Sequence, residues 1–248
     1  MLKSTITSMA LWLCMSVAAL AQSSGPLDGK VFGSGNKALV VVLHGDVSKG
    51  GAADYHYKVA QKIASQNKGT TVLAMLRPGY YDSQKRKSAG SNNGRSDHYT
   101  AKNNQLVAAT IQKMAKQVGT RKIVGLGHSG GAAQLGVIAG AYPNLLDSVI
   151  LVSCPCDIPK WRSMRGKSAW RNSQSPQAFV GKISKRTRVI AITGTSDTNT
   201  RMVLAQSYVA AAKARGVPAI FVPANGASHG FNKMASLAAK YVRQEVNQ

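Results

Sequence analysis

The chain has 248 residues, of which 44% are hydrophobic and 17% charged, with a formal net charge of +23 at pH 7. This composition excludes an intrinsically disordered chain, and the length suits one α/β domain with a sizeable core. The positive charge favours anionic partners, but the basic residues are scattered and match no nucleic-acid-binding motif, so no specific nucleic-acid partner is predicted.

The first 21 residues are predicted to be a secretory signal peptide. Lys3 gives a positive start, residues 9–20 are mostly apolar, and Ala19-Leu20-Ala21 is a small-residue cleavage site. The apolar stretch is shorter than the roughly 20 residues of a spanning helix, and no later segment is predicted to cross a membrane. We therefore expect an exported protein, periplasmic or secreted, whose mature part, 22–248, is a single domain.

After a Gly/Ser-rich entry over 22–35, apolar runs typical of buried parallel strands alternate with helical patterns. In chain order we expect strand 38–43, helix 54–66, strand 70–76, a polar loop over 77–100, helix 101–118, strand 122–127, helix 130–141 and strand 148–154. Residues 155–187 break this rhythm and are expected to form a small cap-like insertion. Strand 188–194, helix 200–215, strand 219–223 and helix 231–242 complete the chain. The alternation predicts an α/β fold with a mainly parallel sheet and helices on both faces.

Two cysteines, Cys154 and Cys156, remain after loss of the signal peptide. In an oxidising compartment they are able to form a disulfide, and packing as two free thiols at a strand end is an equal alternative. No second pair of metal ligands lies nearby, so neither a metal nor a cofactor is predicted.

A nucleophile elbow is predicted at Gly127-His128-Ser129-Gly130-Gly131, where an apolar strand meets a small-residue helix. Ser129 needs a base, and His229 lies between the last strand and the last helix, where the chain order Ser, Asp, His requires the base. Asp197 directly follows strand 188–194 and is the favoured acid that orients the histidine. Asp157, after the preceding strand, is the competing candidate for this role.

An oxyanion formed on a substrate carbonyl needs backbone donors that are already in place. The N–H of Gly130 follows from the elbow. The N–H of Asp46 is the second predicted donor, because it follows His44-Gly45 at the end of strand 38–43.

These segments, with Thr193-Gly194-Thr195-Ser196-Asp197 and Ser228-His229-Gly230, make the chain similar to the α/β-hydrolase superfamily over about residues 31–242. The chain resembles its dienelactone-hydrolase and serine-peptidase-like branches, although serine replaces the cysteine typical of the former. The resemblance implies a single hydrolase domain without a cofactor. It also implies that Ser129 attacks a carbonyl, His229 relays the proton, and an acyl-enzyme is released by water.

Carboxylic esters are the first expected substrate class and peptide amides the second, while a non-catalytic basic binding protein on the same scaffold is an alternative of another kind. We expect a small or polymer-linked ester, with a negatively charged one favoured by basic residues of the insertion. Those residues are Lys160, Arg162, Arg165, Lys167 and Arg171. The further candidate substrate contacts are His44, Gly45, Tyr80, Tyr81, Trp161 and Trp170.

Overall fold

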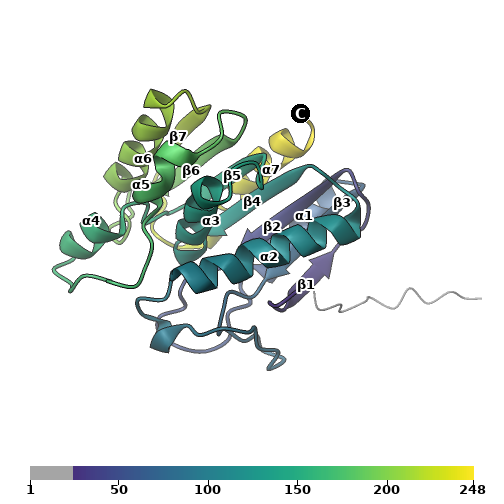
Figure 1. Cartoon of the computed structure of the whole chain (residues 1–248), viewed down its shortest axis with the longest axis horizontal. Helices are drawn as coiled ribbons and strands as arrows, with labels where there is room; N and C mark the ends of the chain where they lie inside the picture. Colours follow the sequence, from purple (N-terminus) through teal and green to yellow (C-terminus); the bar gives the residue numbers. More distant parts are fainter. Residues whose placement is uncertain (1–24) are drawn as a thin grey trace, which may run out of the picture.

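The computed structural model describes residues 25–248, which form one seven-stranded sheet covered by helices on both faces (Figure 1). The predicted signal peptide lies outside the described residues. The strands are β1 (Gly29–Phe32), β2 (Ala38–Leu43), β3 (Thr70–Met75), β4 (Ile123–His128), β5 (Ser148–Val152), β6 (Arg188–Gly194) and β7 (Ala219–Ala224). They lie in the order β1-β3-β2-β4-β5-β6-β7, and β1 alone runs antiparallel to its neighbour.

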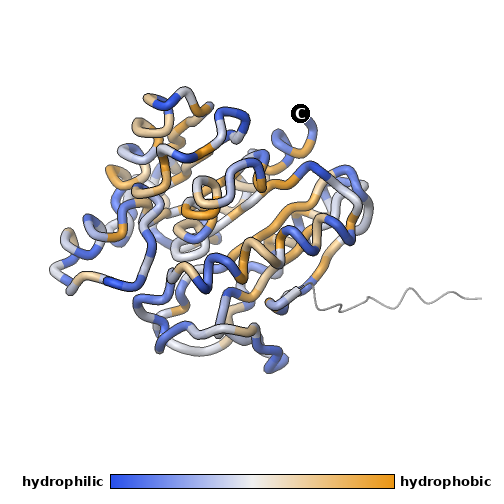
Figure 2. The backbone as a smooth tube through the Cα atoms, viewed as in Figure 1, coloured by the Kyte–Doolittle hydropathy of each residue, from blue (hydrophilic) through white to orange (hydrophobic). Residues whose placement is uncertain are grey.

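The central strands are buried on both sides, which explains why their sequences are continuous apolar runs. In β2, Leu39, Val41 and Leu43 face one core, while Val40 and Val42 face the other. Figure 2 shows hydrophobic strands flanked by helices, several of which, such as α2, alternate hydrophobic and hydrophilic residues. Helices α2 (Ala101–Val118), α3 (Gly130–Ala141) and α6 (Met202–Ala214) contribute to the first core, and α1 (Tyr57–Gln66) and α7 (Ala235–Val246) to the second.

The predicted α/β class is confirmed, with one correction at the amino-terminal side. Strand β1 lies within the segment 22–35, which the sequence indicated as an irregular entry. Its four residues pair with β3 at the edge of the sheet. A short edge strand with a glycine in it carries little periodicity, and its partner is far away in the sequence.

The interruption after β5 contains two short helices, α4 (Ile158–Ser163) and α5 (Pro176–Phe179), followed by a 3₁₀ turn at Val180–Lys182. Cys154 and Cys156 form a disulfide at its start. Asp157 caps α4, because its carboxylate accepts a hydrogen bond from the N–H of Lys160 at 3.1 Å. The competing candidate for the acid is therefore a helix cap.

Because β2 to β7 are parallel, their carboxyl ends share one edge of the sheet, where the loops that follow them meet. Those loops carry the elbow, the His44-Gly45-Asp46 segment, Asp197 and His229. No helix within residues 25–248 combines the length and the apolar character needed to cross a bilayer.

Candidate active site

Ser129 occupies a sharp turn between β4 and α3. Its backbone has φ 53° and ψ −116°, a left-handed conformation that costs energy for any residue with a side chain. The turn is tightly packed, since a Cβ on Gly131 would lie 2.5 Å from the carbonyl oxygen of His44. Glycine is required there, and the strained turn directs the serine side chain away from the sheet.

The structure brings Ser129, His229 and Asp197 into one hydrogen-bonded chain. The Oγ of Ser129 lies 3.0 Å from Nε2 of His229. The Nδ1 of His229 lies 3.0 Å from Oδ2 and 3.2 Å from Oδ1 of Asp197. Nδ1–H therefore donates to the carboxylate, which leaves Nε2 free to accept the serine proton.

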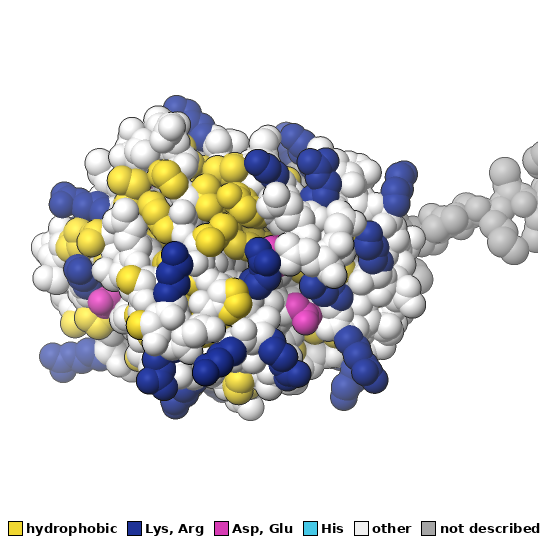
Figure 3. Space-filling model, turned by 90° about the horizontal axis from the view of Figure 1, so that it is seen from above, with side chains coloured by type: hydrophobic (Ala, Val, Ile, Leu, Met, Phe, Trp, Pro, Cys, Tyr) yellow, Lys and Arg dark blue, Asp and Glu magenta, His cyan; other side chains and the backbone are white. Residues whose placement is uncertain are grey.

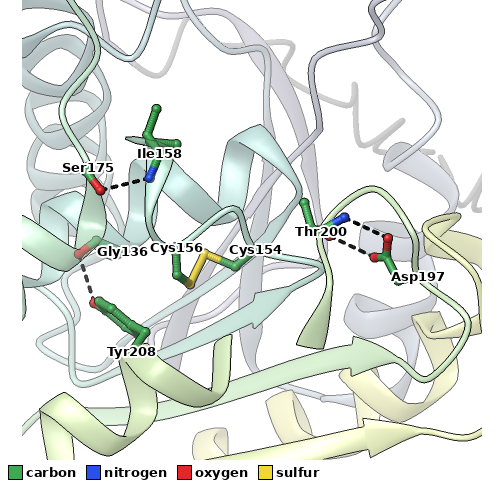
Figure 4. The surroundings of a disulfide bond; sticks show 8 residues. All are labelled: Gly136, Cys154, Cys156, Ile158, Ser175, Asp197, Thr200 and Tyr208. Carbon is green, nitrogen blue, oxygen red and sulfur yellow. Dashed lines mark hydrogen bonds between the residues drawn. A yellow bond between two sulfur atoms is a disulfide. The ribbon is translucent and has the colours of Figure 1, made fainter. Parts of the chain in front are cut away.

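Thr200 supports the carboxylate of this chain, a role that the sequence did not indicate. Its hydroxyl donates to Oδ2 of Asp197 at 2.8 Å, and its N–H donates to Oδ1 at 2.9 Å (Figure 4). The threonine Oγ1 also lies 3.1 Å from Nδ1 of His229. Burial raises the pKa of Asp197, but hydrogen bonds and charge from His229 and Thr200 outweigh it and lower the pKa to about 2.

His128, the residue before the nucleophile, links three loops of the site. Its Nε2–H donates to the carbonyl of His229 at 2.8 Å, so its Nδ1 accepts from the hydroxyl of Tyr55 at 2.6 Å. The Tyr55 oxygen in turn accepts the N–H of Gly45 at 2.5 Å. The imidazole also stacks on Phe231, with ring centroids 5.0 Å apart. Burial, with the nearby His229, lowers the pKa of His128 to about 4, so it stays neutral at pH 7.

The two predicted backbone donors lie close to the serine. A Cβ on Gly45 would be 3.1 Å from the Cβ of Ser129, and a Cβ on Gly130 would be 2.0 Å from Oδ1 of Asp46. The N–H of Gly130 belongs to the first turn of α3, where no intrahelical acceptor exists. Within residues 25–248 the N–H of Asp46 has no hydrogen-bond acceptor either. Both donors are thus available to a bound oxygen.

A buried ion pair holds Asp46 in place. Nη1 of Arg77, whose side chain is fully buried, donates to Oδ1 of Asp46 at 2.9 Å. The hydroxyl of Tyr99 donates to Oδ2 at 2.7 Å, and that of Tyr80 donates to the Asp46 carbonyl at 2.8 Å. Burial raises the pKa of the Asp46 carboxyl, but Arg77 and its other neighbours together lower it below the usual range. The loop that carries the second donor is therefore fixed by an anionic side chain.

A cavity of about 670 Å³ opens in front of Ser129 and His229, within the size range of small-molecule sites. Gly45, Trp161 and Trp170 line it, as the sequence indicated. Trp161 is also anchored, since its indole N–H donates to the carbonyl of Asn199 at 3.1 Å. No cluster of side chains suited to a metal ion occurs among the described residues.

Three other candidate substrate contacts lie elsewhere. His44 is fully buried behind the loop that carries Asp46, where its Nε2 accepts the N–H of Arg77 at 2.9 Å. Tyr80 is buried too, and its hydroxyl is directed at Asp46 rather than at the cavity. Tyr81 forms a backbone bridge with Lys87 and does not line the cavity. Their positions at or shortly after a strand end indicated these residues, but the sequence does not say which of them face the cavity.

Only some of the basic residues of the insertion lie at the cavity, although we expected all five of them to do so. Arg162 and Arg165 line the cavity, whereas Lys160, Lys167 and Arg171 do not.

No protein-family model and no curated protein matches the sequence. Solved structures do match. Est1E from Butyrivibrio proteoclasticus, solved with ferulic acid, superimposes with a TM-score of 0.66 at 16% identity over 90% of this chain and 97% of its own. The monoacylglycerol lipase of Paleococcus ferrophilus gives 0.65 at 16% identity, over 89% and 98%. The chain has the α/β-hydrolase fold.

A longer protein of the same fold also matches. The acylaminoacyl peptidase of Pyrococcus horikoshii gives a TM-score of 0.67 at 15% identity, over 88% of this chain and 39% of the peptidase. The superposition therefore covers only part of that peptidase. Since esterases, lipases and peptidases share the fold, the function must be argued from the site itself.

Proposed function

We propose that the protein is a serine hydrolase that cleaves carboxylic esters. The observation that carries this proposal is the hydrogen-bonded chain from Ser129 through His229 to Asp197 at the base of an open cavity. In the proposed reaction, Nε2 of His229 takes the serine proton while Oγ attacks the carbonyl carbon. The imidazolium then protonates the leaving alcohol, and an acyl-enzyme forms.

Water completes the cycle by the same route. His229 removes a proton from the water, the hydroxide attacks the acyl carbon, and the proton returns to Oγ as the acid leaves. In both halves the N–H groups of Gly130 and Asp46 would stabilise the negative carbonyl oxygen. The proposed role of Asp197 is to hold the histidine in the tautomer with hydrogen on Nδ1 and to stabilise the imidazolium.

The cavity favours a small ester, or a small acyl group linked to a polymer, over an extended peptide. The neighbours Est1E and the monoacylglycerol lipase support this choice, while the acylaminoacyl peptidase keeps amides as the second candidate class. The cations that line the cavity favour a negatively charged ester over a neutral one.

Export is part of the proposal. It rests on the sequence of residues 1–21 and agrees with a disulfide between Cys154 and Cys156, since such bonds persist in oxidising compartments.

The test is a panel of p-nitrophenyl acyl esters and p-nitroanilide amides, assayed with the wild type and with Ser129→Ala. We expect ester turnover by the wild type, weaker or no amide turnover, and loss of both in the variant. Efficient amide turnover would instead make the protein a peptidase or amidase. A folded wild type that turns over neither class would leave the binding protein on a hydrolase scaffold as the correct description.

A further inference from the structure

Four cations line the cavity: Lys49 and Arg95 from the loops after β2 and β3, and Arg162 and Arg165 from α4 and the turn after it. The carboxylate that lines the same cavity, that of Asp46, already pairs with the buried Arg77. Among the described residues, none of the four cations forms a salt bridge. The cavity therefore has an excess of positive charge next to the candidate nucleophile.

Positive charge alone does not mark a site in this protein. Lys and Arg side chains are spread over the face shown in Figure 3, where acidic side chains are few. Most of these cations are solvated lysines and arginines. The three cavity arginines each lie over an aromatic ring next to the candidate nucleophile.

The arginine pair is built on two tryptophans. The guanidinium of Arg162 lies 4.9 Å from the ring centroid of Trp170, and that of Arg165 lies 5.2 Å from that of Trp161. The two indoles pack edge to face, 5.2 Å apart. Trp161 is only 5% exposed, and Trp170 is half-buried.

The two guanidiniums are also close enough to repel each other. Burial, followed by the charge of Arg165, lowers the pKa of Arg162, and the charge of Asp97 opposes this shift only in part. Nε of Arg162 donates to the carbonyl of Ser168 at 2.8 Å, and its two terminal nitrogens have no hydrogen-bond acceptor within residues 25–248. The buried Arg77 and the half-buried Arg86 do have carboxylate partners, Asp46 and Asp82 respectively.

Arg95 lines the same cavity from another loop and is held by hydrogen bonds and by an aromatic ring. Its Nη2 donates to the carbonyl of Gly51 at 2.8 Å, its Nη1 donates to that of Val47, and its guanidinium lies 5.4 Å from the ring centroid of Tyr80. Because these contacts use backbone carbonyls, they leave the positive charge uncompensated.

We propose that Arg162 and Arg165, with Arg95 and Lys49, form a subsite for a carboxylate carried by the ester substrate. A carboxylate placed there would accept hydrogen bonds from the free guanidinium nitrogens and relieve the repulsion between them. The inference rests on the proposed ester hydrolysis, and it names the substrate class as an ester with a carboxylate on its acyl or its alcohol portion.

The test compares esters that differ in charge but hardly in shape. For the alcohol portion the pair is 4-carboxyphenyl butyrate and 4-carbamoylphenyl butyrate. For the acyl portion it is the mono-p-nitrophenyl ester of adipic acid and the p-nitrophenyl ester of adipamic acid. At low ionic strength we expect kcat/KM for the carboxylate to exceed that for its amide by about 10-fold in one pair. The pair that shows the preference identifies which portion of the ester carries the anion.

Two double variants locate the effect. Arg162→Gln with Arg165→Gln should bring the carboxylate-to-amide ratio near 1. Lys113→Gln with Lys116→Gln removes the same charge at the same spacing from the exposed side of α2 and should leave the ratio and the rates unchanged. If the arginine variant does not fold, the salt dependence of the wild-type ratio replaces it, and added NaCl should lower the ratio.

A wild type that hydrolyses all four esters without a charge preference would overturn the subsite and leave the proposed hydrolase intact. A preference that survives in the arginine variant, or is lost equally in the lysine variant, would also overturn it. A folded wild type that hydrolyses none of the four contradicts the proposed function instead.

Discussion

The buried ion pair between Arg77 and Asp46 offers a quantitative test of the site's architecture. Arg77 is fully buried, and its guanidinium donates to Asp46 at 2.9 Å, to Oε1 of Gln134 at 2.6 Å and to the carbonyl of His44 at 3.3 Å. Arg77→Met keeps much of the side-chain volume but removes these donors. The carboxylate of Asp46 then loses its counter-charge while Tyr99 still binds its other oxygen.

Removing one partner of a buried ion pair costs about 3–5 kcal/mol, because the other charge stays buried without compensation. That is a large part of the ~5–15 kcal/mol that stabilises a typical domain. Asp46→Asn should also lower the free energy of unfolding, because the buried Arg77 then keeps its charge without a carboxylate partner. The double variant removes both charges, so its cost should fall short of the sum of the two single costs by more than about 1 kcal/mol.

Urea unfolding, followed by far-UV circular dichroism, measures the four free energies of this cycle. Arg121→Met changes the same residue type at an exposed position and should stay within about 0.5 kcal/mol of the wild type. In a folded Arg77→Met protein, kcat should also fall, since an uncompensated carboxylate next to Gly130 opposes negative charge on the substrate oxygen. Additivity within about 0.5 kcal/mol would refute the coupling of the pair.

Three further predictions concern the triad and the buried histidines. Asp197→Asn should lower kcat by about 10⁴-fold, because the amide no longer holds the tautomer of His229; kinetics on a p-nitrophenyl ester show this, and a loss under 10-fold contradicts the role. Thr200→Val should lower kcat about 10-fold through loss of the hydroxyl donor, and Thr200→Ser should restore it; failure of that rescue would mean that the methyl group matters instead. Burial, together with nearby charges, lowers the pKa values of His98 and His128 to about 4. Between pH 6.5 and 4 the unfolded chain therefore binds more protons than the folded one. The free energy of unfolding should fall as the pH is lowered through this range, by roughly 1–3 kcal/mol per histidine. Urea titrations at pH 7.5, 6 and 4.5 check this, and equal stability at all three would contradict it.

Much of the fold could be predicted because its signals are local. Strand 38–43 was expected from an apolar run, and β2 has the same limits. The elbow has a fixed spacing of glycines around Ser129. The order of strand ends then indicated Asp197 and His229, which the structure brings within hydrogen-bond distance of their neighbours.

The support around the triad could not be predicted in the same way. Arg77 follows a strand as a single charge, and nothing in its local sequence shows that it lies buried against Asp46, 31 positions away. Tyr55 and His128 are 73 positions apart and meet only because the loops after β2 and β4 share one edge of the sheet. Pairing across the sequence depends on the topology, and a single sequence carries no direct signal of it.

The most direct measurement of the central claim is covalent labelling with a fluorophosphonate probe, followed by peptide mapping. We expect stoichiometric labelling of the folded wild type on the peptide that contains Ser129, and no labelling of folded Ser129→Ala. Absence of labelling in the folded wild type, or an adduct on a different residue, would contradict it.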